Sequence, residues 1–248
     1  MKIIAKILIG ALMALAIDLA YLGSIWPDWK DIAQGSIPKS KFIAKYQENR
    51  KTDPRLPTLK WNPSNQSIPK DTSLPFIVAE DSRFYSHEGV DLKALAEAMN
   101  YNIKAQKVVF GASTISQQTV KNLFLSSSKH ILRKWHELVL TVAMESHLRK
   151  ARILQIYLNI AEFGKGIYGI HAAAKSYFGK SMTELTTEEL VELAATLPSP
   201  KKHNPSSRTA SFLKRKDRIL TTIQTYYKSI LPPPDDQDPE LTEYPVAQ

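Results

Sequence analysis

The feature that most constrains this chain is an apolar run at its N-terminus. Residues Ile3–Leu22 are interrupted by charged side chains only at Lys6 and Asp18. A helix of about 20 residues is about 30 Å long, which matches the hydrocarbon core of a bilayer. Lys6 lies near one end of the run, where its side chain can reach the headgroups, and Asp18 lies near the other end. We therefore predict a transmembrane anchor within residues 1–25.

A cleaved signal peptide is the alternative interpretation of this run. Ile7–Leu15 has the length of a signal-peptide h-region, and Ala14–Ala16 resembles a cleavage site. The apolar run continues past that site, and Tyr21, Trp26 and Trp29 follow as aromatic anchors, which favours an uncleaved span. Lysines flank the run on both sides, so the positive-inside rule does not give its orientation.

The charge balance of the chain indicates an anionic partner. The sequence has 33 basic and 24 acidic side chains, but five of the acidic ones lie in the last 18 residues, which contain no Lys or Arg. Residues 1–230 therefore carry a net charge of +14. A body this basic is typical of proteins that bind nucleic acid, anionic lipid or a phosphate-bearing substrate. The chain has no cysteine, which excludes disulfides, thiolate zinc sites and cysteine nucleophiles.

Beyond the apolar run the chain divides into three stretches. Residues 26–72 carry several prolines and weak periodicity, which indicates a linker or an irregular strap along a domain. Residues 73–230 have helical periodicity, with a capping box at Thr186 and Glu189. Residues 231–248 form a Pro-rich acidic tail, which we expect to be extended or disordered. Strands do not alternate with helices, so a doubly wound sheet is excluded and a mostly α fold is predicted.

The first cluster of residues that could take part in catalysis is Glu80–Gly89, which follows the apolar run that ends at Ala79. A carboxylate that leaves an apolar helix for a polar turn can have a raised pKa, which suits a general base. Glu80 is the candidate for that role. The alternative is an ordinary helix end with solvated charges.

The second cluster is Gly111–Asn122, a row of hydroxyl and amide side chains. Ser113 or Thr114 can cap a helix whose first turn offers free N–H groups to an anion. Lys121 lies one turn after Gln117, so an ammonium and amides share one side of this helix. Such a face can bind sugars and phosphates, although an ordinary capped polar helix is the alternative. The spacing excludes a Walker A loop.

The third cluster is Arg133–Glu137, at the start of an apolar helix. Arg133 and Glu137 are four residues apart and share a face. The pair is either a guanidinium fork for phosphate beside a second carboxylate or a surface ion pair of little energetic value.

The fourth cluster spans residues 152–180 and is rich in small residues. Small residues allow helices to approach closely, so we interpret most of this stretch as architecture.

In their order and spacing, the four clusters resemble the peptidoglycan glycosyltransferases, in the monofunctional, membrane-anchored form. The resemblance covers roughly residues 72–230 and assigns 73–230 as the glycosyltransferase domain. Two positions depart from the family pattern: Ala112 stands where a second glycine is common, and Lys129 stands where some relatives have an arginine near the phosphates. The residues that carry the resemblance are Glu80, Asp81, Phe84, His87 and Gly89; Gly111, Ser113, Thr114, Ile115, Gln117, Gln118, Lys121 and Asn122; Arg133, Lys134 and Glu137; and Ile153, Leu154, Tyr157, Leu158 and Asn159.

The resemblance implies a lysozyme-like helical domain that polymerises lipid II. The sugar 4-hydroxyl of lipid II would attack the anomeric carbon of a lipid-linked glycan, with inversion and loss of polyprenyl pyrophosphate. Glu80 and Glu137 would be the catalytic residues, with no tightly bound cofactor but with Mg²⁺ or Mn²⁺ as an ion that Glu80 shares with pyrophosphate. Substrate binding is implied for Asp81, Phe84, His87, Ser113, Thr114, Gln117, Gln118, Lys121, Asn122, Lys129, Arg133 and Lys134.

The resemblance also implies the partners and the location. The partners would be lipid II, the lipid-linked glycan strand, membrane lipids and cell-wall synthesis or division proteins, with no nucleic acid. The protein would cross the cytoplasmic (inner) membrane once, with its catalytic domain on the periplasmic side. About 18 residues remain after Ile230, too few for a transpeptidase domain.

Two other classes of protein remain as alternatives. A lysozyme-like glycan hydrolase would also use two carboxylates, but it needs neither the cations at Lys121, Arg133 and Lys134 nor a membrane span. A non-enzymatic, membrane-tethered basic protein would explain the charge and the anchor, but not the hydroxyl and amide row. Residues 101–110 mix lysines with apolar side chains, and we predict that they lie at a membrane surface.

Overall fold

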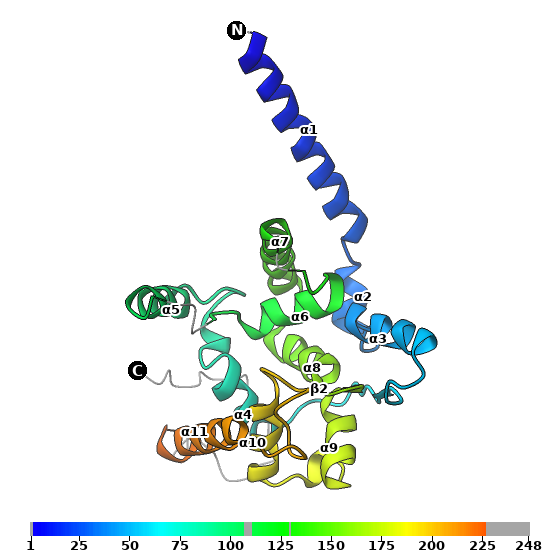
Figure 1. Cartoon of the computed structure of the whole chain (residues 1–248), viewed down its shortest axis with the longest axis vertical. Helices are drawn as coiled ribbons and strands as arrows, with labels where there is room; N and C mark the ends of the chain where they lie inside the picture. The colour runs from blue at the N-terminus through cyan, green and yellow to red at the C-terminus, as the bar shows by residue number, and fades with distance from the viewer. Residues whose placement is uncertain (1, 107–110, 129, 227–248) are drawn as a thin grey trace.

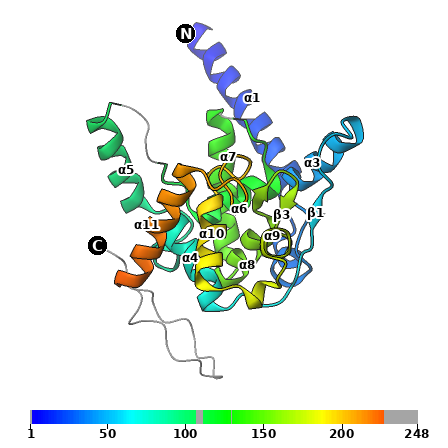
Figure 2. The same cartoon turned by 60° about the horizontal axis from the view of Figure 1, so that its bottom comes forward.

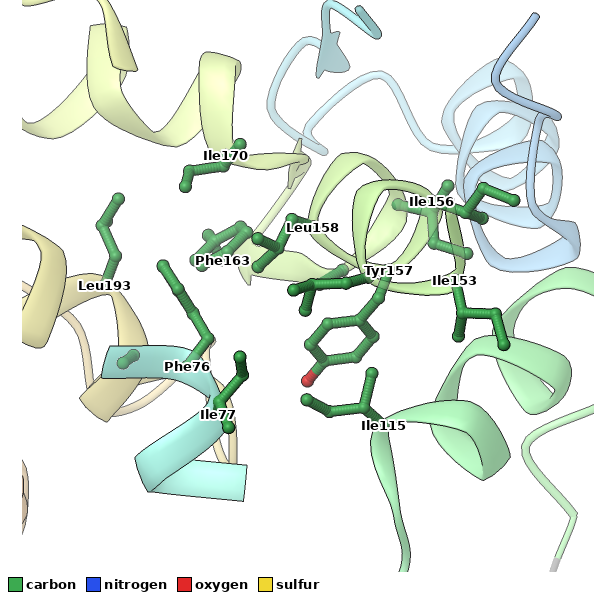
Figure 3. Close-up of a cluster of buried hydrophobic side chains, with 14 of the residues drawn as sticks. Phe76, Ile77, Ile115, Ile153, Ile156, Tyr157, Leu158, Phe163, Ile170 and Leu193 are labelled. Carbon is green, nitrogen blue, oxygen red and sulfur yellow. The ribbon is translucent and has the colours of Figure 1, made fainter. Parts of the chain in front are cut away.

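Helix α8 (Lys150–Ile160) lies at the centre of the fold, and every residue from Ile153 to Ile160 is buried. A helix that is buried on all sides must be covered by other elements. Helix α6 packs on it directly, and side chains from α4, α9 and α10 join the same core. Figure 3 shows this core, with Tyr157 of α8 between Ile77 of α4 and Ile115 of α6. The computed structural model describes residues 2–106, 111–128 and 130–226.

The elements follow one another as helices with one small sheet, so the predicted mostly α fold is confirmed. Three short strands form the sheet in the order β1-β3-β2, with β1 parallel and β2 antiparallel to β3. In chain order the elements are α1 Lys2–Ile25, α2 Trp29–Gln34, α3 Lys41–Thr52, β1 Lys60–Trp61, α4 Lys70–Glu80, α5 Leu92–Lys104, α6 Ile115–Phe124, α7 Ile131–His147, α8, β2 Glu162–Gly164, β3 Ile167–Tyr168, α9 Ile170–Phe178, α10 Thr187–Thr196 and α11 Ala210–Tyr226.

Helix α1 projects away from the rest of the molecule (Figures 1 and 2). Among the described residues it provides most of the one candidate membrane span, Ile3–Gln34, and its side chains from Ile3 to Ile17 are exposed. Only its C-terminal end joins the body, where Leu22 is buried. The helix therefore fits the predicted membrane anchor by length, composition and exposure.

The stretch 26–72 is more ordered than a linker, because it contains α2, α3 and β1. Trp29, Ile32 and Ile43 are buried in the main core. Weak periodicity hid these helices from sequence analysis, since each is short and begins at a local cap, Asp28 for α2 and Ser40 for α3.

Polar side chains on one face of α8 fasten this strap to the domain. Arg152 donates to the backbone carbonyls of Ile32 and Gly35. Gln155 donates to the carbonyl oxygens of residues 65 and 66, and Asn159 accepts from the backbone N–H of Ser64 at 2.8 Å. The architectural interpretation of the fourth cluster therefore agrees with these contacts.

Local side-chain caps explain where several helices start. Thr186 and Glu189 form the predicted capping box of α10, and the side chain of Asp91 caps α5. The predicted helical stretch ends in α11, as far as the described residues extend. The tail 231–248 and the end of the 101–110 stretch lie outside the described residues.

Candidate active site

Glu80 is the last residue of α4, and its carboxylate faces α6 and α11. Its Oε1 accepts a hydrogen bond from Nη2 of Arg215 at 2.7 Å, and its Oε2 accepts one from Nε2 of Gln118 at 2.9 Å. The side chain is only 11% exposed. Burial raises the pKa of Glu80, although the Arg215 cation and both hydrogen bonds act in the opposite direction.

Tyr157 determines which way the Gln118 amide points. The buried Tyr157 hydroxyl donates to Oε1 of Gln118 at 3.2 Å. Because this oxygen is taken as an acceptor, the amide NH₂ is left to face Glu80. The chain of bonds runs from the central helix α8 through α6 to the carboxylate, so the core of the fold orients the candidate base.

Asp81 joins the loop after α4 to the start of α6. Its carboxylate accepts hydrogen bonds from the Ile115 backbone N–H at 2.9 Å and from Nε2 of His87 at 3.0 Å. The Gly89 backbone N–H donates to Nδ1 of His87, which identifies Nε2 as the protonated nitrogen. Thr114 Oγ1 donates to the Gly89 carbonyl oxygen at 2.6 Å. These bonds hold the loop against the N-terminus of α6.

The N-terminus of α6 differs from its sequence-based interpretation as an open anion site. Thr114 caps the helix, because its Oγ1 accepts from the N–H of Gln117 at 3.1 Å and its own N–H donates to Oε1 of Gln117. The Ile115 N–H is already bonded to Asp81. The carboxylate of Asp81 is therefore the anion at this positive helix end, and a substrate phosphate does not have these donors available.

Several residues expected to bind substrate are buried. Phe84 has no exposed surface and lies under Nζ of Lys150 at 4.6 Å from the ring centroid. Asp81, Thr114 and Gln117 are also buried, and their polar atoms bond to neighbouring protein groups. Direct substrate contact, as expected from sequence, does not fit Phe84 and Gln117, which line none of the cavities described below, whereas Asp81 and Thr114 support the loop and also line the smaller cavity beside Glu80.

Glu137 lies on α7 and is held by two cations. Its carboxylate accepts hydrogen bonds from Nη1 of Arg133 and from Nζ of Lys134, one turn earlier on the same helix. The Glu137 side chain is only 3% exposed, so this is a buried ion pair and not the surface pair considered from sequence. Lys134 also approaches Oγ of Ser113 at 3.5 Å, which connects α7 to the loop before α6.

Lys121 is a cation of the cleft that has no anionic partner among the described residues. In the described ranges, no hydrogen bond or ion pair involves its ammonium. Burial lowers the pKa of Lys121, the charges of Arg133 and Lys134 lower it further, and the charges of Glu137 and Glu80 oppose the shift. The ammonium therefore lies within electrostatic range of both candidate catalytic glutamates.

A cleft runs past these groups. A cavity of about 630 Å³ is lined by Glu80, Ser113 and Gln118 together with α11 residues that include Arg215. A second cavity of about 260 Å³ adjoins it at Glu80 and Ser113 and is bounded by α5. A third, of about 200 Å³, adjoins it at Gln118 and is lined by Lys121 and Asn122. The candidate base and the Lys121 ammonium thus line neighbouring cavities that share Gln118.

The arrangement does not fit a divalent ion held by Glu80. Both oxygens of its carboxylate are engaged by Arg215 and Gln118. In the part of the chain that the structure describes, no group of three His, Asp or Glu side chains is placed to hold a metal ion.

Sequence reasoning missed Arg215 as a site residue. The sequence of α11 contains several basic residues, and no local pattern shows which of them faces Glu80. Lys129, expected near the phosphates, lies outside the described residues.

The chain is similar to known proteins over most of its length. A family model described as "Transglycosylase" matches residues 51–224. The chain is 38% identical over 231 residues to a "Biosynthetic peptidoglycan transglycosylase" of Janthinobacterium sp. (strain Marseille), covering 91% of this chain and 98% of the relative. Proteins with the same name from Shewanella oneidensis, 50% identical over 166 residues (64% of this chain and 71% of the relative), and Chromobacterium violaceum, 38% identical over 228 residues (91% and 97%), are also similar.

Proposed function

The chain belongs to the transglycosylase family, a family of lysozyme-like helical peptidoglycan glycosyltransferases, and from this membership we propose that it polymerises lipid II into linear glycan strands. The reaction inverts the configuration at the anomeric carbon and releases polyprenyl pyrophosphate. We propose polymerisation alone, without transpeptidation, because the relative that the chain matches over 98% of its length is named only as a transglycosylase.

The observation that carries this proposal is the pairing of a buried base with an unpaired cation. Glu80 and Lys121 line two neighbouring cavities that share Gln118 as a wall residue. A sugar hydroxyl needs a base to become a nucleophile, and a pyrophosphate leaving group needs positive charge where its own negative charge develops. The cleft offers both.

The step proceeds by displacement at the anomeric carbon of the lipid-linked donor. Glu80 takes the proton from the acceptor 4-hydroxyl. The hydroxyl oxygen bonds to the anomeric carbon of the donor as the bond from that carbon to pyrophosphate breaks. The raised pKa of Glu80 makes it a stronger base than an ordinary carboxylate. Arg215 and Gln118 hold the carboxylate in place and favour its ionised form before the acceptor arrives.

The leaving group is stabilised by cations from α6 and α7. Lys121 has no protein anion bonded to it within the described ranges, so its charge is available to pyrophosphate. Arg133 and Lys134 supply further charge, and Glu137 holds both in position through its carboxylate. Glu137 therefore acts on the reaction mainly by fixing cation geometry.

The remaining site residues divide into two groups by exposure. Ser113, Gln118 and Asn122 line the cleft and are proposed to contact substrate. The group proposed to position the cleft walls comprises Asp81, Phe84, His87, Thr114 and Gln117. We also propose that Lys129 contacts the substrate phosphates.

The location follows from the substrate. A lipid-linked donor and acceptor lie in a bilayer, and α1 is suited to cross it. We propose a single-pass protein of the cytoplasmic (inner) membrane with the catalytic domain on the periplasmic side, where it contacts lipid II, the lipid-linked glycan, membrane lipids and cell-wall synthesis or division proteins. Exposed apolar side chains on α5, such as Leu92, Met99 and Ile103, support contact with lipid.

Incubation of the purified full-length protein with lipid II tests this function. Products that grow in size and are then degraded by a muramidase support polymerisation. Cleavage of preformed glycan without growth from lipid II identifies the hydrolase alternative. Neither reaction, together with retained binding to anionic vesicles, identifies the non-enzymatic alternative.

A further inference from the structure

Asp18 is a carboxylate within the apolar span of α1, and its partners lie on α7. Its Oδ1 accepts a hydrogen bond from Nε2 of His136 at 2.6 Å, and its Oδ2 accepts one from Nε1 of Trp135 at 3.2 Å. The Tyr21 ring packs on the His136 imidazole with centroids 4.9 Å apart. Figures 1 and 2 show α7 next to the C-terminal part of α1.

These contacts differ from those expected of an unpaired charged side chain near a helix end, which would point to solvent or to lipid headgroups. An ionisable side chain in a membrane span is costly unless it is paired, and such residues usually have a role. Both carboxylate oxygens of Asp18 are satisfied, and the Asp18 and His136 side chains are 19% and 10% exposed. Lys6, the other charged residue of the span, makes no such bond to any described residue.

The partner residues directly precede the buried Glu137. Trp135 and His136 lie between the pair Arg133–Lys134 and Glu137, so the α1 contact and the cation group share one turn of α7. Exposed apolar side chains at Ile131 and Leu132 continue the α7 surface beside this turn. If the angle between α1 and α7 is fixed, the position of Arg133 and Lys134 relative to the bilayer is therefore fixed as well.

We propose that Asp18 is a positioning residue, which docks α1 onto α7 through His136 and Trp135. Docking holds the catalytic cleft at the height and angle from which it receives the headgroup of a lipid-linked substrate. The docking itself follows from the contacts above, whereas its catalytic consequence rests on the proposed function.

Docking predicts a specific kinetic pattern. If only the docked arrangement receives the substrate, undocking reduces the fraction of competent enzyme before binding, and the apparent affinity falls in proportion to that fraction. Asp18→Leu should therefore raise KM for lipid II in bilayers by roughly tenfold, while kcat changes by less than about twofold. A variant that merely unfolds would lose kcat instead.

The distance between the helices can be measured without any activity. The chain has no cysteine, so Ile17→Cys and Val142→Cys place spin labels at exposed sites of α1 and α7. In vesicles of phosphatidylethanolamine and phosphatidylglycerol, the parental pair should give a narrow distance distribution and Asp18→Leu a broad one. Lys6→Leu, which removes the other charge of the span, should leave the distribution narrow.

His136→Phe provides a second, independent variant, because it keeps ring packing and removes the donor. It should broaden the distribution and raise KM as Asp18→Leu does, and the double variant should add little to either single one. A distribution for Asp18→Leu as narrow as the parental one would overturn the proposal, as would an unchanged KM. If the parental protein does not polymerise lipid II, the distances still decide the docking, and only the proposed function fails.

Discussion

Arg215 donates a hydrogen bond from Nη2 to Oε1 of Glu80 at 2.7 Å, joining α11 to the end of α4 across 135 residues of chain. The same nitrogen donates to the Ala79 carbonyl oxygen at 2.9 Å, so the guanidinium is held by the backbone as well. Burial raises the pKa of Glu80, and the charge of Arg215 is the largest influence that lowers it. The protonation of the candidate base therefore depends on a residue from the other end of the domain.

Removing this cation should change the pH dependence of polymerisation. Glu80 works as a base when ionised, so the rate falls as pH drops through its pKa, which lies above the usual carboxyl value of about 4.3. Arg215→Met removes the charge that favours ionisation, so the acid limb of kcat should move to higher pH. Arg218→Met is the matched control, because Arg218 lines the same cavity without bonding to Glu80. An acid limb that stays in place would contradict the assigned electrostatics.

The two glutamates should separate chemistry from binding. Glu80→Gln removes the base but little binding charge, so it should abolish polymerisation and retain binding of lipid II. Glu137→Gln loosens Arg133 and Lys134, so it should lower the rate and also weaken binding. Binding assays and single-turnover polymerisation measure the two effects.

The control for both variants is Glu48→Gln, at an exposed position on α3. Parental rates in Glu80→Gln would remove the centre of the proposed mechanism. If instead Glu137→Gln alone spared binding, the two roles should be exchanged.

Removing a cation that stabilises the pyrophosphate leaving group should lower the rate strongly but leave the fold intact. Lys121→Ala and Arg133→Ala should each lower kcat by on the order of a hundredfold or more, because each removes a charge aimed at pyrophosphate. Circular dichroism should show an intact fold, and Lys51→Ala on exposed α3 should keep parental rates. Since burial lowers the pKa of Lys121, the parental rate should also fall on the alkaline side at a pH below the usual lysine value of about 10.4. Near-parental turnover in both variants would exclude these roles.

Asn159 should matter for stability more than for chemistry. It is fully buried, accepts from the Ser64 backbone N–H at 2.8 Å and donates to the Gln155 carbonyl oxygen. Asn159→Ala leaves the Ser64 N–H without this partner and should cost about 1–3 kcal/mol of unfolding free energy. Urea unfolding measures the loss, with the exposed Asn49→Ala as control. Equal midpoints for the two variants would show that this bond does not fasten the strap.

The anchor can be tested by fractionation. Helix α1 is apolar and exposed over most of its length, so the full-length protein should remain in the membrane fraction after washing with high salt or alkaline carbonate. Release by either wash would count against a spanning helix. A mature N-terminus at Ile17 would instead support the cleaved signal peptide.

Helix caps show how far local sequence reasoning reaches. The capping box of Thr186 and Glu189 could be predicted because both partners lie within one turn. The N-terminal cap of α6 could also be predicted, but the group that binds the free N–H at this helix end could not. Asp81 fills that helix end from 34 residues away, and no local pattern specifies such a contact.

The sequence by itself determined the candidate membrane span, the helical class and the residue types that the chemistry needs, because apolar runs, helical periodicity and motif spacing are local properties of the chain. Only the tertiary structure decided which polar side chains remain available. Phe84 and Thr114 are used to build the cleft walls, whereas the Lys121 ammonium makes no hydrogen bond or ion pair with any described residue. The reason is physical: a polar group is available to a substrate only if no distant part of the chain has already satisfied it, and the folded arrangement sets those distances.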